Sequence, residues 1–321
     1  MFNYFYLVNI NTGDYMKIRL GYACITNCLD STSSSPYTYG EYLKYGDMEK
    51  LDRVIVSNLK SLEEIIYYNI KNNIHFYRMS SKIIPLATKS DVKFDYINKY
   101  KSYYDKIGKM ISDYDMRVDF HPDQFCVLNS VKSDVVSASI DILKYHYSLL
   151  EALGIKNKIL VLHVGSNSFG KDNSIRRFIN NFNKLPNYLK KCIAIENDDK
   201  VFNASDVLEI SKNTGVPVIL DYHHHLCNKS DFSFEDIFNS FNNRKVKMHF
   251  SSPRNKKDFR SHNDYINGDD FINFIKILKK YDRDVDIMIE AKCKDDSLFR
   301  LVRYIKYKTD YKFIDDTTFM V

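Results

Sequence analysis

Histidine and carboxylate side chains follow short hydrophobic runs at six places along this 321-residue chain. Runs rich in Val, Ile and Leu predict buried strands. Imidazole nitrogens and carboxylate oxygens, without thiolates, suit Zn²⁺ or Mn²⁺. Because parallel barrel strands end on one face, the six positions predict one metal-binding cluster. They are His121 after VDF, His163 after LVL, Glu196 after IAI, Asp221 after VIL, His249 within VKMHF and Glu290 after VDIMI.

Two further histidines, His224 and His262, lie in segments that follow these runs and belong to the same predicted face. Any single member of the set is more often a hydrogen-bonded core or loop residue than a metal ligand. Burying so many ionisable groups together is costly unless metal ions or paired charges compensate. The number of donors exceeds what one tetrahedral ion needs, so we expect two or three ions bridged by a carboxylate. Such clusters typically split phosphate esters.

The elements that must position these side chains alternate between strand and helix. Helical periodicity is clear over 47–72 and 131–153, and weaker over 92–112, 172–190, 204–214, 232–243, 269–281 and 295–307. About eight strand–helix repeats predict a single-domain (β/α)8 TIM-type barrel. An open doubly wound sheet is the alternative, but it needs a glycine-rich loop after its first strand, where this chain has YACITNC. The expected strands are 18–22, 74–78, 116–121, 159–163, 192–196, 216–221, 246–250 and 285–290.

Composition sets few limits on function. The chain is 44% hydrophobic and 27% charged, with no linker-like segment, so we expect one barrel domain over 16–321 and an N-terminal extension over 1–15. The formal charge of +6 is compatible with a polyanionic partner but equally with a lysine-rich surface. We expect the six cysteines to be reduced thiols and find no signal peptide or membrane span, which indicates a cytoplasmic protein.

Nine segments in order, spread over nearly the whole chain, resemble the UV damage endonuclease family, whose members are related to the endonuclease IV-type barrels. Together HPDQ, IENDD, DYHH and KMHFSS make the resemblance specific. The segments are RLGYA at 19–23, YRMSSKIIPLAT at 77–88, FHPDQFCVLNS at 120–130, LVLHVGS at 160–166, AIENDD at 194–199, ILDYHHH at 219–225, KMHFSSPR at 247–254, RSHNDYI at 260–266 and MIEAKCKD at 288–295.

The resemblance implies a role for each matched ligand. One metal is expected on His121, His163 and Glu196, and Glu196 would bridge to a second metal. The resemblance assigns Asp221, His249 and Glu290 to that second metal, and His224 and His262 to a third. Mn²⁺ is the expected ion, with Zn²⁺ or Mg²⁺ as alternatives. The residues implied in catalysis are Glu196, Lys247, His249 and Glu290, where Lys247 matches a lysine that the family can carboxylate; an ordinary lysine near phosphate is the alternative.

Contacts to damaged double-stranded DNA are also implied. Gln124 and Phe125, with Tyr22, match residues that probe the duplex at the lesion, although Phe125 packing under the barrel rim is the alternative. Arg254, in a basic loop with Lys256, Lys257 and Arg260, is expected on the DNA backbone. Arg78, at a predicted strand end, is expected to contact substrate or to support the ligands.

The activity implied is a metal-dependent nick immediately 5′ to UV photoproducts and other helix-distorting lesions, leaving 3′-hydroxyl and 5′-phosphate ends. The protein is expected to be a monomer that associates with the nucleoid through DNA. Two alternatives stay open. One is a metal-dependent sugar isomerase or epimerase on the same barrel, and the other is a damaged-DNA-binding protein with weakened catalysis.

Lys89 is the one departure from the family pattern, which usually has a histidine there near the first metal. A protonated lysine is repelled by a dication, so it should turn away or lose its proton, and the first site should bind metal more weakly than the second. We therefore expect Lys89→His to raise the affinity for Mn²⁺, measured by metal titration, without changing the fold. Unchanged or lower affinity would instead assign Lys89 a contact of its own, most simply with DNA phosphate.

Overall fold

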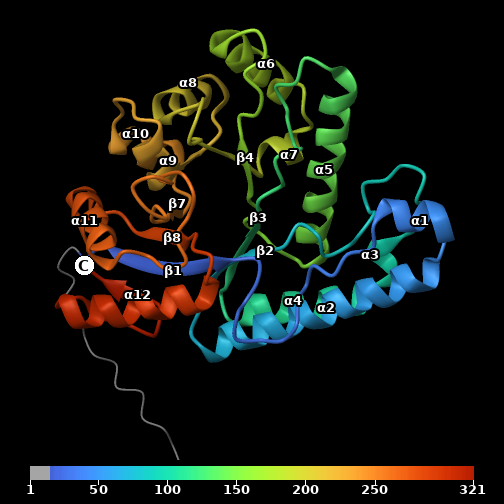
Figure 1. Ribbon diagram of the computed structural model, residues 1–321, viewed down its shortest axis with the longest axis horizontal. Coiled ribbons are helices and arrows are strands. Elements are labelled where there is room, and N and C mark those ends of the chain that lie inside the picture. Colours follow the sequence, from blue (N-terminus) through green and yellow to red (C-terminus); the bar gives the residue numbers. More distant parts are fainter. Residues whose placement is uncertain (1–14) are drawn as a thin grey trace, which may run out of the picture.

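Eight parallel strands close into a barrel in the computed structural model, which describes residues 15–321 (Figure 1). Each strand pairs with the next, and β8 pairs with β1, so all eight expected strands and the barrel are confirmed. The predicted extension over 1–15 lies outside the described residues except for Tyr15. The strands are β1 (Lys17–Ala23), β2 (Phe76–Met79), β3 (Arg117–Phe120), β4 (Leu160–His163), β5 (Ile193–Glu196), β6 (Val218–Asp221), β7 (Val246–Phe250) and β8 (Val285–Ile289).

Helices surround the barrel and connect successive strands (Figure 1). The expected helix over 172–190 is divided, because Pro186 begins a new helix and cannot continue the one before it. The helix expected over 92–112 is likewise divided, at Tyr100. The helices are α1 (Tyr39–Tyr45), α2 (Met48–Lys71), α3 (Tyr96–Lys99), α4 (Lys101–Asp113), α5 (Ser133–Ala152), α6 (Lys171–Asn183), α7 (Asn187–Lys190), α8 (Ala204–Thr214), α9 (Tyr222–Cys227), α10 (Phe234–Ser240), α11 (Gly268–Leu278), a 3₁₀ turn (Lys279–Tyr281) and α12 (Lys294–Lys308).

Helix α2 contains the periodic hydrophobic residues that predict a helix over 47–72. Leu51, Ile55, Leu59 and Leu62 recur at three- and four-residue steps, and all four side chains are buried. Asp47 begins the helix, accepting a hydrogen bond from the backbone N–H of Lys50. In the part of the chain that the structure describes, no helix is long and apolar enough to cross a membrane.

Charged side chains fill one layer of the barrel interior. Asp286 on β8 accepts hydrogen bonds from Arg19 on β1 and, across the barrel, from Arg117 on β3, at 2.6 and 2.8 Å. Lys247 on β7 reaches across to Asp119 on β3, with 2.5 Å between Nζ and Oδ2. Alternate residues of a strand face the same side. Because Asp119 and Lys247 point inward, the residues two positions later, His121 and His249, also point into the barrel.

A short C-terminal hairpin completes the barrel wall and was not predicted from the sequence. It comprises β9 (Lys312–Phe313) and β10 (Thr318–Met320), and β10 pairs antiparallel with the start of β1. The end of β1 pairs instead with β2, at Tyr22 and Ala23. These strands are too short to give a clear alternating pattern, which is why sequence periodicity does not reveal them.

Gly21 on β1 provides a test of this packing. A Cβ atom at this position would overlap the backbone carbonyl of Phe76 on β2, and backbone cannot move aside cheaply. We expect Gly21→Ala to lower the free energy of unfolding by about 1–3 kcal/mol, measured by denaturant titration. Gly40→Ala in α1 is the control, because a Cβ there meets nothing within 4 Å. Equal stability of the two variants would contradict the close approach of β1 and β2.

Candidate metal centre

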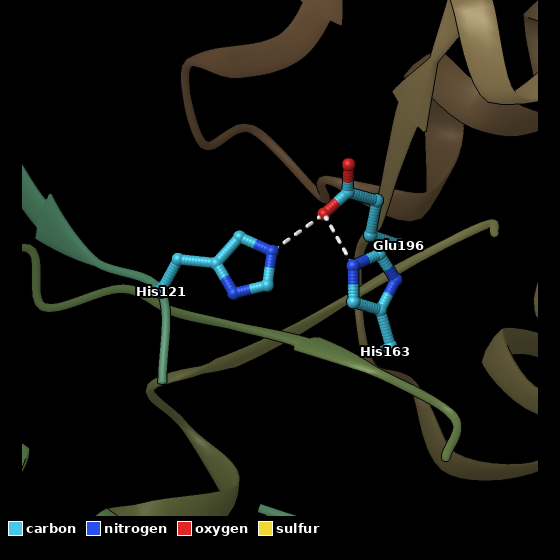
Figure 2. Close-up of side chains that lie close together, drawn as sticks. All are labelled: His121, His163 and Glu196. Atoms are coloured by element: carbon cyan, nitrogen blue, oxygen red, sulfur yellow. Dashed lines mark hydrogen bonds and ion pairs between the residues drawn. The ribbon is translucent and has the colours of Figure 1, made fainter. Parts of the chain in front are cut away.

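Two histidines face one carboxylate oxygen at the ends of β3, β4 and β5. Glu196 Oε2 lies 2.9 Å from His121 Nε2 and 3.8 Å from His163 Nε2 (Figure 2). His121 Nδ1 donates a hydrogen bond to the Pro122 carbonyl at 3.0 Å, so a neutral ring directs the Nε2 lone pair at the carboxylate. Two electron-pair donors this close need a proton or a cation between them. The three residues therefore form a suitable partial ligand set for a metal ion.

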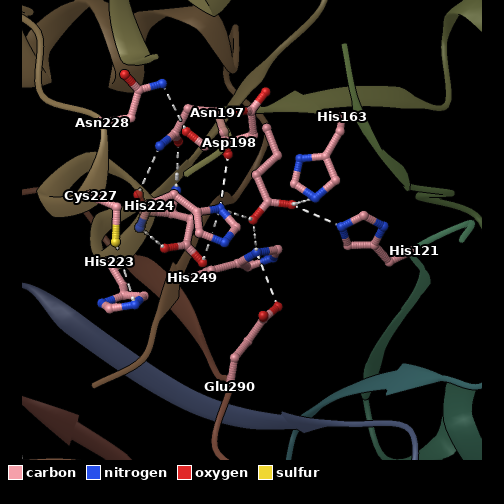
Figure 3. Close-up of polar contacts among 12 residues, drawn as sticks. His121, His163, Asn197, Asp198, His223, His224, Cys227, Asn228, His249 and Glu290 are labelled. Carbon is pink, nitrogen blue, oxygen red and sulfur yellow. Dashed lines mark hydrogen bonds and ion pairs between the residues drawn. The ribbon is translucent and has the colours of Figure 1, made fainter. Parts of the chain in front are cut away.

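The same glutamate belongs to a second group, at the ends of β5, β6 and β8 and on β7. Its other oxygen, Oε1, lies 2.7 Å from His249 Nδ1, which is also 3.3 Å from Glu290 Oε1 (Figure 3). With Asp221, these residues offer four ligand atoms that all lie within 4.8 Å of one another. The expected convergence of the six strand-end residues is confirmed, and Glu196 is the member common to both groups.

Asp221 is held by the short helix α9, which the sequence did not predict. One of its oxygens, Oδ1, caps the helix by accepting a 2.7 Å hydrogen bond from the backbone N–H of His224. Asn197 fixes the Asp221 backbone with hydrogen bonds of 2.9 and 3.0 Å. The other oxygen, Oδ2, is buried without a hydrogen-bond partner. A buried carboxylate oxygen needs compensation, and a bound cation would supply it.

The protonation states of the two groups favour cation binding. Burial alone would raise the pKa of Glu196, but His249 and His163 lower it well below its ordinary value. Burial would likewise raise the pKa of Glu290, yet Arg78 and His249 hold it low. Burial lowers the pKa of His121 and of His249, despite their glutamate neighbour. Ionised carboxylates beside neutral imidazoles match the form in which both residue types bind metal.

Arg78 lies against the second group and does not reach the surface. Its guanidinium is 2.7 Å from Glu290 Oε1 and donates a 2.8 Å hydrogen bond to His249 Nε2. A guanidinium can only donate, so His249 Nε2 accepts, and His249 Nδ1 donates to Glu196. Only 6% of Arg78 is exposed, so the structure does not support the predicted contact with DNA and favours the alternative of support for the ligands.

Lys247 lies one layer below His249 and is fully buried. Burial lowers the pKa of its ammonium group to about 8, although Asp119 opposes that shift. The Lys247 ammonium group also lies 5.3 Å from the ring centroid of Phe76. Of the two alternatives that the sequence left open, a direct phosphate contact does not fit these surroundings, whereas a lowered pKa increases the neutral amine that carboxylation requires.

The predicted third metal site is less complete. The ring centroids of His224 and His262 lie 6.2 Å apart, and His224 Nδ1 donates to the Asn197 carbonyl. Burial lowers the pKa of His224, but Asp221, Glu196 and Glu290 outweigh it and raise it to about 9. Among residues 15–321, the groups of three or more clustered donors are the two described above. The third site therefore stays a prediction.

The residues predicted to contact DNA divide into exposed and buried sets. Gln124 and Phe125 are exposed on the loop after β3, with 70% of Phe125 accessible, so packing of Phe125 under the rim is excluded. Arg254 is exposed on the loop after β7. Tyr22 is completely buried and donates to Asn69 on α2. Its predicted contact with the lesion is wrong for this structure, because strand alternation turns Tyr22 towards the helices.

Lys89 is exposed on the loop after β2. Its ammonium lies 4.9 Å from the ring centroid of Tyr39. The expected repulsion of Lys89 by a metal ion stays a prediction. Sequence reasoning missed the contribution of Asn197 and the internal direction of Arg78. Both lie in matched segments, IENDD and YRMSS. Asn197 was not singled out because an amide is not a usual metal ligand, and for Arg78 the sequence left substrate contact and support of the ligands open.

Comparison with known proteins gives one consistent result. A family model described as UV-endonuclease UvdE matches residues 18–318. A UV DNA damage endonuclease from Bacillus cereus (strain B4264) is 37% identical over 298 residues, covering 89% of this chain and 94% of that protein. The crystal structure of SacUVDE has a TM-score of 0.82 at 35% identity and covers 90% of this chain and 98% of that chain. Endonuclease IV from Thermus thermophilus, at 12% identity and a TM-score of 0.56, covers 91% of this chain and 100% of that chain and shares the fold.

The shared glutamate generates a direct test of the metal centre. We expect Glu196→Gln to keep the fold but to lower the metal content of both groups, because a neutral amide cannot hold two cations together. Metal content after equilibration with Mn²⁺, with circular dichroism to confirm folding, measures this. Glu235→Gln is the control, since Glu235 is a surface carboxylate paired with Arg283. Metal binding equal to that of the control would reject the bridging role.

Proposed function

Because this chain belongs to the UV-endonuclease UvdE family, we propose that it nicks duplex DNA immediately 5′ to UV photoproducts and other helix-distorting lesions. We propose that water displaces the 3′ oxygen from the phosphorus, so that breaking the P–O3′ bond leaves a 3′-hydroxyl and a 5′-phosphate. The observation that carries the proposal is the pair of donor groups that share Glu196 at the carboxyl ends of the barrel strands. This is the face on which barrels of this type carry their active sites.

The donor set suits divalent ions, with Mn²⁺ proposed and Zn²⁺ or Mg²⁺ as alternatives. His121, His163 and Glu196 would hold one ion, and Glu196, Asp221, His249 and Glu290 a second. When bound, such ions lower the pKa of water and neutralise charge on a phosphate. The chain itself keeps its carboxylates ionised and fixes their directions, through the α9 cap at Asp221 and the Arg78 contact at Glu290.

Arg78 has a further consequence for this site. Arg78 donates a hydrogen bond to His249 Nε2, and His249 Nδ1 donates a hydrogen bond to Glu196. Coordination through either nitrogen therefore requires His249 to give up one of these hydrogen bonds. We propose that His249, Glu290 and Glu196 act at the reacting phosphate. Lys247 supports them from the layer below, either as an ammonium paired with Asp119 or as a carboxylated side chain.

Exposed side chains on the loops around this centre support the proposed DNA substrate. Phe125 and Gln124 project from the loop after β3, and Arg254 lies on the loop after β7 beside Lys256 and Lys257. A hollow of about 310 Å³ lies against the same β3 loop, with Asp123 and His146 in its lining. An aromatic ring and an amide fill a gap in the base stack, and basic side chains follow the backbone. We propose that the lesion is recognised by its easier unstacking.

The two alternative functions explain fewer of the features of this site than the proposed endonuclease does. A sugar isomerase would use the same metals but gives no reason for an exposed Phe125 or for a basic loop at 254–260. A binding protein without catalysis was suggested by Lys89, yet the two donor groups are assembled without that residue. We further propose that the protein acts as a monomer, in the cytoplasm, and associates with the nucleoid through its substrate.

A UV-irradiated, end-labelled duplex incubated with the protein and Mn²⁺ tests the function. We expect one new product that ends immediately 5′ to the photoproduct, can be extended by a polymerase and disappears with chelator. The unirradiated duplex is the control. Binding of the irradiated duplex without cleavage at any metal concentration would favour the inactive binding protein. Turnover of ketoses without nicking would favour the isomerase.

Gln124 and Phe125 supply a separate prediction. We expect replacement of both Gln124 and Phe125 by Ala to weaken discrimination between damaged and undamaged duplex by ~1–3 kcal/mol, because stacking on one base is worth about that much. Competition binding with both duplexes measures the ratio, and metal content should stay unchanged. An unaltered preference for the damaged duplex would remove the probing role from this pair.

A further inference from the structure

Phe169 is a strained aromatic residue on the loop between β4 and α6. Its φ angle is 63°, in the left-handed region that bulky residues avoid, and 79% of the residue is exposed. Neither property is explained by packing, because an exposed ring is stabilised by no core contact. A residue keeps a strained backbone conformation only when the surrounding structure holds it there, and such residues are common at functional sites.

The backbone around Phe169 is fixed by α6. Asn173 donates a 2.7 Å hydrogen bond to the Phe169 carbonyl, and Arg177 donates a 2.5 Å bond to the Ser168 carbonyl. The Ser174 hydroxyl donates to the same Ser168 carbonyl. These side chains hold the loop from its C-terminal side. The ring is thus presented to solvent by a rigid support.

Hydrogen bonds join the loop after β4, which carries Phe169, to the loop after β3, which carries Phe125. Asn129, which is fully buried, accepts from the Ser166 backbone N–H and donates to the Ser166 carbonyl, both at 2.7 Å. Arg177 also donates to the Asn129 carbonyl at 2.9 Å. At Gly165, where φ is 111°, a Cβ atom would lie 2.7 Å from Asn129 Oδ1, so the contact requires glycine. Hydrogen bonds therefore join the loops after β3 and β4, and each loop carries one exposed phenylalanine.

We propose that Phe169 is a second DNA-contacting residue, which stacks on a base exposed by the distortion while Phe125 occupies the other side of the distorted region. The inference rests on the proposed function. Phe169 follows His163 by six residues, on the face that carries the donor groups. The three residues before it, Ser166, Asn167 and Ser168, are polar, so the preceding chain adds no apolar side chain to the ring. A single rigid ring is suited to the π-face of a base.

Two substitutions separate this contact from a structural role. Phe169→Ala removes the ring, and Phe169→Gly also relieves the left-handed strain, so the glycine variant should melt at a higher temperature than the alanine variant. Tyr307→Ala is the matched control, because Tyr307 is 82% exposed near the end of α12. Helices run opposite to the strands here, which places that end on the other face of the barrel.

The measurements are affinity for a UV-irradiated duplex and the fluorescence of 2-aminopurine placed beside the photoproduct. We expect both Phe169 variants to bind about tenfold more weakly and to lose stacking-dependent quenching, with metal content unchanged. Affinity and quenching equal to those of Tyr307→Ala would overturn the inference while wild-type nicking stands. A change in the oligomeric state of Phe169→Ala with unaltered DNA affinity would also overturn it, in favour of a protein contact. A wild-type protein that neither binds nor nicks the duplex would overturn the proposed function and this inference together.

Discussion

The buried charge of Glu196 is the constraint on which the site is organised. Only 1% of the residue is exposed, and its two oxygens face His121 and His163 on one side and His249 on the other. A carboxylate in such a place is tolerated only with compensating partners. The barrel supplies them by ending several strands with donor residues on one face, so that no single loop has to assemble the cluster.

A second layer of buried charge lies directly beneath the donor groups. Barrel interiors are usually filled by branched apolar side chains, whereas this one contains the Lys247–Asp119 pair and the two arginines on Asp286. Burial favours the neutral form of Asp286, but Arg19 and Arg117 lower its pKa and keep it ionised. Ion pairs that cross the interior from β3 to β7 and β8 fix the relative positions of strands that are not neighbours. The donor residues at the ends of these strands are therefore held in fixed relative positions.

The barrel and the six converging donors could be predicted from the sequence, because each strand is a short hydrophobic run and each donor lies at or beside its end. What could not be predicted depends on direction and on long-range contact. The sequence does not show that Tyr22 turns outward to Asn69, or that Arg78 turns inward to Glu290. Helix α9 depends on a cap by Asp221, a residue already assigned to a metal ion, and β10 depends on a partner about 300 residues away.

The pairing of β1 has a consequence for how the protein is made. Its first residues lie between β8 and β10, with Ile18 opposite both Val285 and Phe319. During synthesis β1 leaves the ribosome long before either partner exists, so this strand has unpaired backbone donors and acceptors while most of the chain is translated. Open strand edges promote aggregation, and distant pairings form slowly. The barrel therefore cannot close until the residues around 320 have emerged, and translational pausing late in the message would prolong the exposure of this edge.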